Sequence, residues 1–181
     1  MIFDQFDLNG QHVLHHAVMN CKESVFIFIL THGECTTPEE IASKVSQNQK
    51  SVLKMDPCVL SKCTDGSAPL HVTCKFGNLK MTEILLNIGV PIEIRDSNLK
   101  TPLIVATYCQ NIETVIYLIS KGANILAEDK ELDNCLHWAA YCGNQELMNL
   151  FLTFGLDINK PDDFMQTAVH MTCMCGNINA V

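Results

Sequence analysis

The stretch DNCLHWAAYCGN, residues 133–144, decides the fold because much of it returns at a fixed distance along the chain. It holds two cysteines, one histidine and the chain's single tryptophan, so in isolation it suggests a metal site or a thiol beside its base. Its Leu136-His137 pair, however, has counterparts at a constant step of 33 positions, at Leu70-His71, Leu103-Ile104 and Val169-His170. A repeated structural unit therefore has to be considered before any site.

Other positions keep the same period. The repeated columns are Gly77, Gln110, Gly143 and Gly176; Asn78, Asn111, Asn144 and Asn177; Gly89, Gly122 and Gly155; and Asp96, Asp129 and Asp162. An earlier copy contains Leu14-His15, which precedes Leu70-His71 by 56 positions rather than 33, so 23 positions are inserted between the first two copies.

Each copy is long enough for two short helices. Thr101 is suited to cap the first helix and Pro102 to occupy its first position, where a missing N–H does no harm. Gly143 then turns the chain, residues 145–153 carry leucines at helical spacing, and Gly155 ends the second helix. The segment that follows forms a turn, here called a finger, leading to the next copy. One copy cannot bury its apolar face alone, so neighbouring copies must stack.

The period and its contents resemble the ankyrin repeat, whose pattern D-x-x-G-x-T-P-L-H-x-A appears in pieces as DGSAPLH at 65–71, KTPLIVA at 100–106 and NCLHWAA at 134–140. The resemblance implies an all-α solenoid of about five helix-turn-helix units with a helical insertion after the first. The predicted boundaries are 7–33 for repeat 1, 34–62 for the insertion, 63–95 for repeat 2, 96–128 for repeat 3, 129–161 for repeat 4 and 162–181 for a truncated repeat 5.

The insertion has a strong helix-start signal. Thr37 is predicted as the N-cap, Pro38 as the first helical residue and Glu40 as the partner of a capping box, while Pro57 would stop the helix. Two interpretations stay open: a tolerated surface excursion, or a partner-binding or regulatory element, because long insertions in repeat proteins map to one face.

The amino-acid composition excludes some classes of function. The net charge is −8 and the pI about 5.2, which argues against nucleic-acid binding and against adsorption to an anionic membrane. The N-terminus lacks the apolar core of a secretory signal, and the longest strongly apolar run, VFIFIL at 25–30, is too short to span a bilayer. We therefore expect a cytoplasmic location and reduced thiols, despite ten cysteines. Both ends interrupt a repeat, which suggests that the rest of a longer chain flanks them.

No catalytic, cofactor or metal site is predicted. The close cysteine pairs, Cys58-x₄-Cys63 and Cys173-x-Cys175, lack the second half that structural zinc requires. A catalytic Cys–His pair is disfavoured because His15, His71, His137 and His170 form a column, which favours a structural role at each helix start. No phosphate loop or acid–base carboxylate pair is evident.

The cysteine columns give two further predictions. Cys74 and Cys173 share the frame position of Ala140, so both should be buried. Cys109, Cys142 and Cys175 should form a ladder of free, half-exposed thiols, because stacked units lie too far apart for disulfides.

The best-supported function is non-catalytic binding of a protein partner on the concave face, because ankyrin repeats usually grip partners with finger residues and the exposed end of the first helix. Trp138 is predicted to pack between repeats, since its column, Val72, Val105, Trp138 and Met171, is apolar. Asp133, Tyr141 and Cys142 should face outward. The candidate partner-binding residues are Asn98, Lys100, Tyr108, Glu131, Asp133, Tyr141, Phe164 and Gln166.

Two narrower resemblances give alternatives. The run TPLIVAT at 101–107, with Lys121-Gly122-Ala123 and Leu136-His137, is similar to the N-terminal ankyrin region of TRPA-type cation channels, which implies the cytoplasmic part of a calcium-permeable channel. The run NCLHWAA at 134–140 is similar to the ankyrin domain of histone H3 lysine-9 methyltransferases, which implies a nuclear targeting domain. That family's methyl-lysine cage matches here at Trp138 but not at Lys100, Val105 and Tyr108.

Overall fold

The computed structural model describes residues 7–8, 11–20, 22–30, 37 and 57–177, and this part of the chain is built from paired short helices. The helices are α1 (Val13–Met19), α2 (Glu23–Leu30), α4 (Pro69–Lys75), α5 (Leu79–Asn87), α6 (Pro102–Tyr108), α7 (Ile112–Ser120), α8 (Cys135–Cys142), α9 (Gln145–Thr153) and α10 (Ala168–Met174). A short 3₁₀ helix, η1 (Pro57–Leu60), precedes α4.

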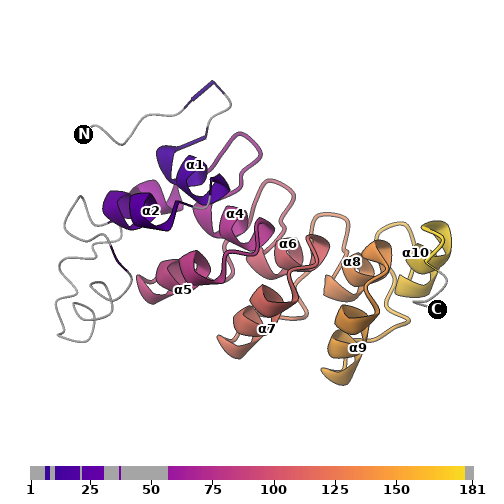
Figure 1. Ribbon diagram of the computed structural model, residues 1–181. Coiled ribbons are helices and arrows are strands. Elements are labelled where there is room, and N and C mark those ends of the chain that lie inside the picture. Colours follow the sequence, from indigo (N-terminus) through magenta and orange to yellow (C-terminus); the bar gives the residue numbers. More distant parts are fainter. Residues whose placement is uncertain (1–6, 9–10, 21, 31–36, 38–56, 178–181) are drawn as a thin grey trace.

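The helices form two rows (Figure 1). The first row runs α1, α4, α6, α8, α10, each helix in contact with the next, and α2, α5, α7 and α9 lie behind their first-row partners. Loops join α5 to α6, α7 to α8 and α9 to α10. Within the described residues, the predicted all-α solenoid is confirmed. The helix start predicted at Pro38 and Glu40 lies outside the described residues, and the repeat boundaries stay predictions.

Small side chains let the two rows approach closely. Ala106, Ala139 and Ala140 are fully buried, as are Leu103 and Leu136 of the repeated leucine column apart from about 1% of their surface. Close-packed apolar contacts of this kind contribute most of the stability of a repeat array, because each unit completes its core on its neighbours.

The histidine column ties successive units together. Nδ1 of His71 accepts the N–H of Ala68 (3.1 Å), just before α4, and its Nε2 donates to the carbonyl of Lys100 in the next finger (3.0 Å). His137 makes a similar pair of bonds: its Nδ1 accepts the N–H of Asn134 (3.3 Å), and its Nε2 donates to the carbonyl of Lys160, just before the finger that begins at Asp162 (3.0 Å). Burial lowers the pKa of both rings, which fits the neutral form that these bonds require. The predicted structural role is confirmed for His71 and His137.

The cysteine predictions hold in part. Cys74 is buried, and Cys109 and Cys142 are half-buried free thiols, as expected. Cys173 and Cys175 are both exposed, so the prediction of a buried Cys173 is wrong. Its frame equivalents are covered by the second helix of their own unit, whereas no second-row helix packs behind α10 within the described residues.

Candidate functional site

Hydrogen bonds to the repeated aspartates determine the backbone conformation of the fingers. Oδ1 of Asp129 accepts the N–H groups of Glu131 and Asp133 (both 3.0 Å), and Oδ1 of Asp162 accepts those of Phe164 (2.8 Å) and Gln166 (2.7 Å). These bonds replace the missing backbone partners of a tight turn. Because the turn is the same in each unit, side chains one repeat period apart come to equivalent places beside the first-row helices.

The finger tips carry exposed apolar residues in a left-handed backbone conformation. Leu99, Leu132 and Met165 have φ near +60° and are 48%, 43% and 76% exposed, where the earlier unit has Gly66. Such a conformation costs a non-glycine residue about 1 kcal/mol. These residues were not among the predicted candidates, although steps of one repeat period from Gly66 lead to each of them. Strained, exposed apolar tips are candidates for partner contact.

The α6–α8 groove is the space between those two helices and their fingers. Its tryptophan, Trp138, finds both its cation and its hydrogen-bond acceptor within this chain. The Lys100 Nζ lies 3.7 Å from the centre of the Trp138 ring, and the indole N–H donates to Asp129 Oδ2 (3.0 Å). Tyr108 packs edge-on against Trp138, with ring centres 5.1 Å apart. Trp138 therefore does pack between units, as predicted, while remaining partly exposed in the groove.

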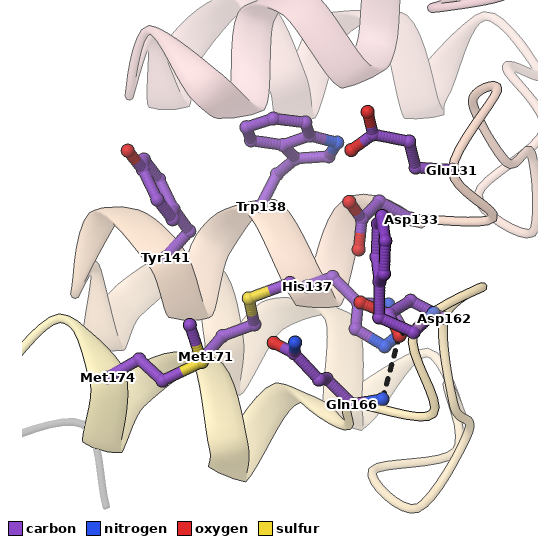
Figure 2. Close-up of a pocket in the computed structure, with 10 residues that line it drawn as sticks. Glu131, Asp133, His137, Trp138, Tyr141, Asp162, Gln166, Met171 and Met174 are labelled. Carbon is purple, nitrogen blue, oxygen red and sulfur yellow. Dashed lines mark hydrogen bonds between the residues drawn. The ribbon is translucent and has the colours of Figure 1, made fainter.

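The α8–α10 groove is the equivalent space one unit further on, and it encloses a cavity of about 190 Å³. Figure 2 shows how side chains from both helices and both fingers surround it. Its lining residues are Glu131, Asp133, His137, Trp138, Tyr141, Asp162, Phe164, Gln166, Met171 and Met174. Aromatic rings and thioethers form its walls, and among these lining residues there are three carboxylates and no Lys or Arg.

Two carboxylate oxygens in the α8–α10 groove have no hydrogen-bond partner among the described residues: Oδ1 of Asp133 and Oδ2 of Asp162. The two side chains are only 5% and 3% exposed. Burial, followed by repulsion from the carboxylates of Asp129, Asp162 and Glu131, raises the pKa of Asp133 to about 7. The groove thus buries two carboxyl groups, each with one oxygen that receives no hydrogen bond from the described residues, and Lys100 offsets part of the rise in the pKa of Asp133.

The structure gathers the eight candidate partner-binding residues along these two grooves. Those lining the α8–α10 groove are Glu131, Asp133, Tyr141, Phe164 and Gln166, and those at the α6–α8 groove are Asn98, Lys100 and Tyr108. The expectation that Asp133 faces outward is wrong: its side chain is buried beside His137 and Trp138 at the floor of the groove. Trp138, absent from the candidates, lines both grooves.

The chemistry around α8 does not favour catalysis. Burial raises the pKa of Cys135 to about 12 and also raises that of Cys142, so neither thiol is readily ionised to a nucleophile. Both ring nitrogens of His137 are engaged in hydrogen bonds. Within the described residues, no cluster of three or more His, Cys, Asp or Glu side chains could hold a metal ion, and no helix has the length and apolar character to cross a membrane.

Stacked helix pairs with aspartate-shaped fingers define a repeat protein of the α-solenoid class. Comparison with known families agrees: the model described as "Ankyrin repeats (3 copies)" matches residues 40–129, and that described as "Ankyrin repeats (many copies)" matches residues 136–181. The chain belongs to the ankyrin-repeat family. Members of this family are in general non-catalytic modules that bind other proteins.

A relative supports this assignment over a short stretch. The chain is 49% identical over 41 residues to a fowlpox virus (strain NVSL) protein named for its ankyrin repeats. The match covers 23% of this chain and 22% of the relative, so it spans less than a quarter of either protein.

Proposed function

We propose that this chain binds a segment of a protein partner, without catalysing a reaction on it, along the α6–α8 and α8–α10 grooves. This is the face formed by the fingers and the first-row helices, which corresponds to the concave face expected from sequence. The observation that carries the proposal is a set of three exposed aromatic rings at these grooves, Tyr108, Tyr141 and Phe164, which are 47%, 48% and 63% exposed. Exposed aromatics beside polar groups are typical of binding hot spots.

The arrangement of these residues favours an extended ligand. The rings of Tyr108 and Tyr141 lie 6.4 Å apart on successive first-row helices, with Trp138 edge-on to both. The exposed apolar residues Leu99, Leu132 and Met165 also recur once per unit, at the finger tips. A partner segment lying across units can therefore meet the same kinds of side chain several times, which adds affinity without requiring a deep pocket.

Partner capture tests the proposal. Tyr108, Tyr141 and Phe164 are changed to alanine together, and the proteins retained from cell lysate are compared with those retained by the unmodified chain. The matched control changes Ile116, Leu126 and Phe154 to alanine, because these are exposed apolar residues (52%, 63% and 49%) outside the two grooves. We expect the first variant to lose the partner and the second to keep it. Equal retention by two folded variants would refute the proposal.

The two narrower resemblances remain alternatives. They differ from the proposal in where the array would lie in the cell, and both keep its role as a binding module. As part of a TRPA-type channel the array would lie on the cytoplasmic side of a membrane, and as a methyltransferase targeting domain it would be nuclear. In the α6–α8 groove the chain's own Lys100 covers the face of Trp138 that a methylated ammonium group would need, which does not favour the second alternative. The coding sequence of the full-length transcript on either side of this chain tests both.

A further inference from the structure

The two grooves occupy equivalent positions in the repeat but differ in charge. The residue 33 positions after Lys100 is Asp133, and the residue 33 positions after Trp138 is Met171. The α6–α8 groove therefore contains its own cation and an indole N–H donor, whereas the α8–α10 groove contains an extra carboxylate and a thioether. The repeat position that supplies a positive charge to one groove therefore supplies a carboxylate to the other.

The consequences appear in the hydrogen bonds. Asp129 and Asp162 both use Oδ1 to shape their fingers. Asp129 Oδ2 then accepts the indole N–H of Trp138. Asp162 Oδ2 has no such donor, since Met171 has no polar hydrogen, and Asp133 Oδ1 is left without a partner as well. Buried polar atoms without partners are rare in native proteins and call for an explanation such as an absent ligand.

We infer, on the basis of the proposed partner-binding function, that the α8–α10 groove is a recognition pocket for an arginine side chain of the partner, with Asp133 and Asp162 accepting hydrogen bonds from its guanidinium group. The net charge of the chain, −8, also favours a basic partner segment. No group within the described part of the chain fills this role.

The lining of the groove favours a guanidinium over an ammonium. A guanidinium is planar, carries five N–H donors in a fixed array and is weakly hydrated, so it can donate to two carboxylates while it stacks on an aromatic ring. Phe164, Tyr141 and Trp138 provide such rings, and Met171 and Met174 provide polarizable walls. An ammonium would remain more strongly hydrated and would exploit the flat walls less well.

The pocket can be tested by two-dimensional ¹H–¹⁵N NMR on the whole chain titrated with N-acetyl-L-arginine N-methylamide. The saturable shifts should be centred on the indole N–H of Trp138 and the backbone amides of Asp133, Phe164 and Gln166. The matched neutral probe is the citrulline analogue, which has the shape of arginine with a urea in place of the guanidinium, and the matched cation is the lysine analogue. We expect both to bind about tenfold more weakly than the arginine probe, as loss of charged hydrogen bonds implies.

Matched variants distinguish specific binding in the pocket from nonspecific attraction to the negative charge of the whole chain. Asp133→Asn and Asp162→Asn should each weaken arginine binding about tenfold. In Asp162→Asn the new side chain retains an amide oxygen for the finger bonds, so the turn should persist. Asp163→Asn, which removes the same charge from the exposed neighbouring position, should change binding less than about twofold.

Each contrary result overturns a defined part of the inference. Equal binding of the citrulline or lysine analogue would exclude a guanidinium site, and equal weakening by D163N would show that only bulk charge matters. If the arginine probe leaves the groove unperturbed while partner capture still requires Tyr108, Tyr141 and Phe164, the arginine pocket is wrong and the proposed function stands. If the probe binds as described and the triple alanine variant still captures the partner, the proposed function is wrong and the arginine pocket stands.

Discussion

The α6–α8 and α8–α10 grooves show how one repeated scaffold produces two different surfaces. In both, an aspartate Oδ1 shapes the second finger, Asp129 in one groove and Asp162 in the other, and a tyrosine of the earlier first-row helix contributes to the groove. The position of His137 in the α8–α10 groove is occupied by Ile104 in the α6–α8 groove. Three substitutions in the repeat change the outcome: Lys100 becomes Asp133, Trp138 becomes Met171, and Gln110 becomes Gly143. The repeated backbone fixes the positions of the side chains. The residue types at those positions determine whether the carboxylate oxygens in a groove receive hydrogen bonds from the chain itself.

The largest expected effect comes from removing His137, which lines the α8–α10 groove where the α6–α8 groove has Ile104. His137→Ala removes the acceptor for Asn134 N–H and the donor to the Lys160 carbonyl, and it leaves a cavity in a position that is 2% exposed. We expect a loss of roughly 2–4 kcal/mol in the free energy of unfolding. A fall in Tm of about 4–12 °C would follow, measurable by circular dichroism.

His71→Ala is the matched variant on α4, two units earlier, because its Nε2 donates to the Lys100 carbonyl over the same distance of 3.0 Å. If either alanine variant were as stable as the unmodified chain, the histidines would not be what ties successive units together.

The second expected effect concerns the carboxyl group of Asp133, which lies in the α8–α10 groove at the position that Lys100 holds in the α6–α8 groove. The folded-state pKa of Asp133 is raised from 3.8 to about 7, so the folded chain holds the proton more tightly than the unfolded chain does. Ionisation of Asp133 therefore opposes folding: the penalty is absent below about pH 4, grows as the pH rises and is complete above about pH 7. Asp133→Asn should stabilise the chain by roughly 1–3 kcal/mol at pH 8.

This stabilisation should shrink as the pH is lowered from 8 to 5, as followed by urea denaturation at each pH. Asp163→Asn is the control, since that side chain is exposed and should show no such dependence. A gain from D133N that is the same at pH 5 and pH 8 would mean that Asp133 is not ionised against a penalty. A gain that follows the pH, together with weaker arginine binding, would show that the chain sacrifices stability to keep this pocket charged.

The third prediction concerns the cation that the α6–α8 groove supplies for itself. Lys100→Met keeps the length of the side chain but removes the ammonium over Trp138, which should cost about 0.5–1 kcal/mol. Because Lys100 also lowers the pKa of Asp133, the variant should raise that pKa further. The emission of Trp138, the chain's single tryptophan, reports the change directly. Lys130→Met is the control, and an equal change in emission there would contradict the cation–π contact.

The repeat frame could be predicted from sequence because a fixed period constrains every unit at once. Asp129, His137 and Gly143 were placed correctly by their columns, and the candidate binding residues fall along two adjoining grooves. The oxygens of Asp133 and Asp162 that lack hydrogen-bond partners were not predicted; for Asp162 the reason is that Met171 stands where Trp138 donates to Asp129 in the preceding unit. The exposure of Cys173 was missed for a different reason: a column describes an interior unit and fails where a covering helix is lacking.

The smallest expected effect concerns the turns that follow α6 and α8, at Gln110 and Gly143. Gly143 adopts φ 67°, and Asn177 beside it donates to the carbonyls of Ala140 and Tyr141 (both 3.0 Å). At the equivalent turn Gln110 adopts φ 59°, and Asn144 donates instead to the Gln110 side chain (3.3 Å). A Cβ placed on Gly143 would lie 2.6 Å from Asn177, so the Cβ of Gln110 is the reason that Asn144 cannot take the same position.

Gln110→Gly should therefore relieve the left-handed strain and let Asn144 donate to the end of α6. Part of this gain is offset by the greater freedom of glycine in the unfolded chain, so a net stabilisation of about 0.5 kcal/mol is expected, or a rise in Tm of about 1–2 °C. Gln110→Ala keeps the Cβ and loses the side-chain amide, so it should give no gain. If the alanine variant matched the glycine variant, the difference between the two turns would not arise from the Cβ, and the two grooves would differ only in the side chains that line them.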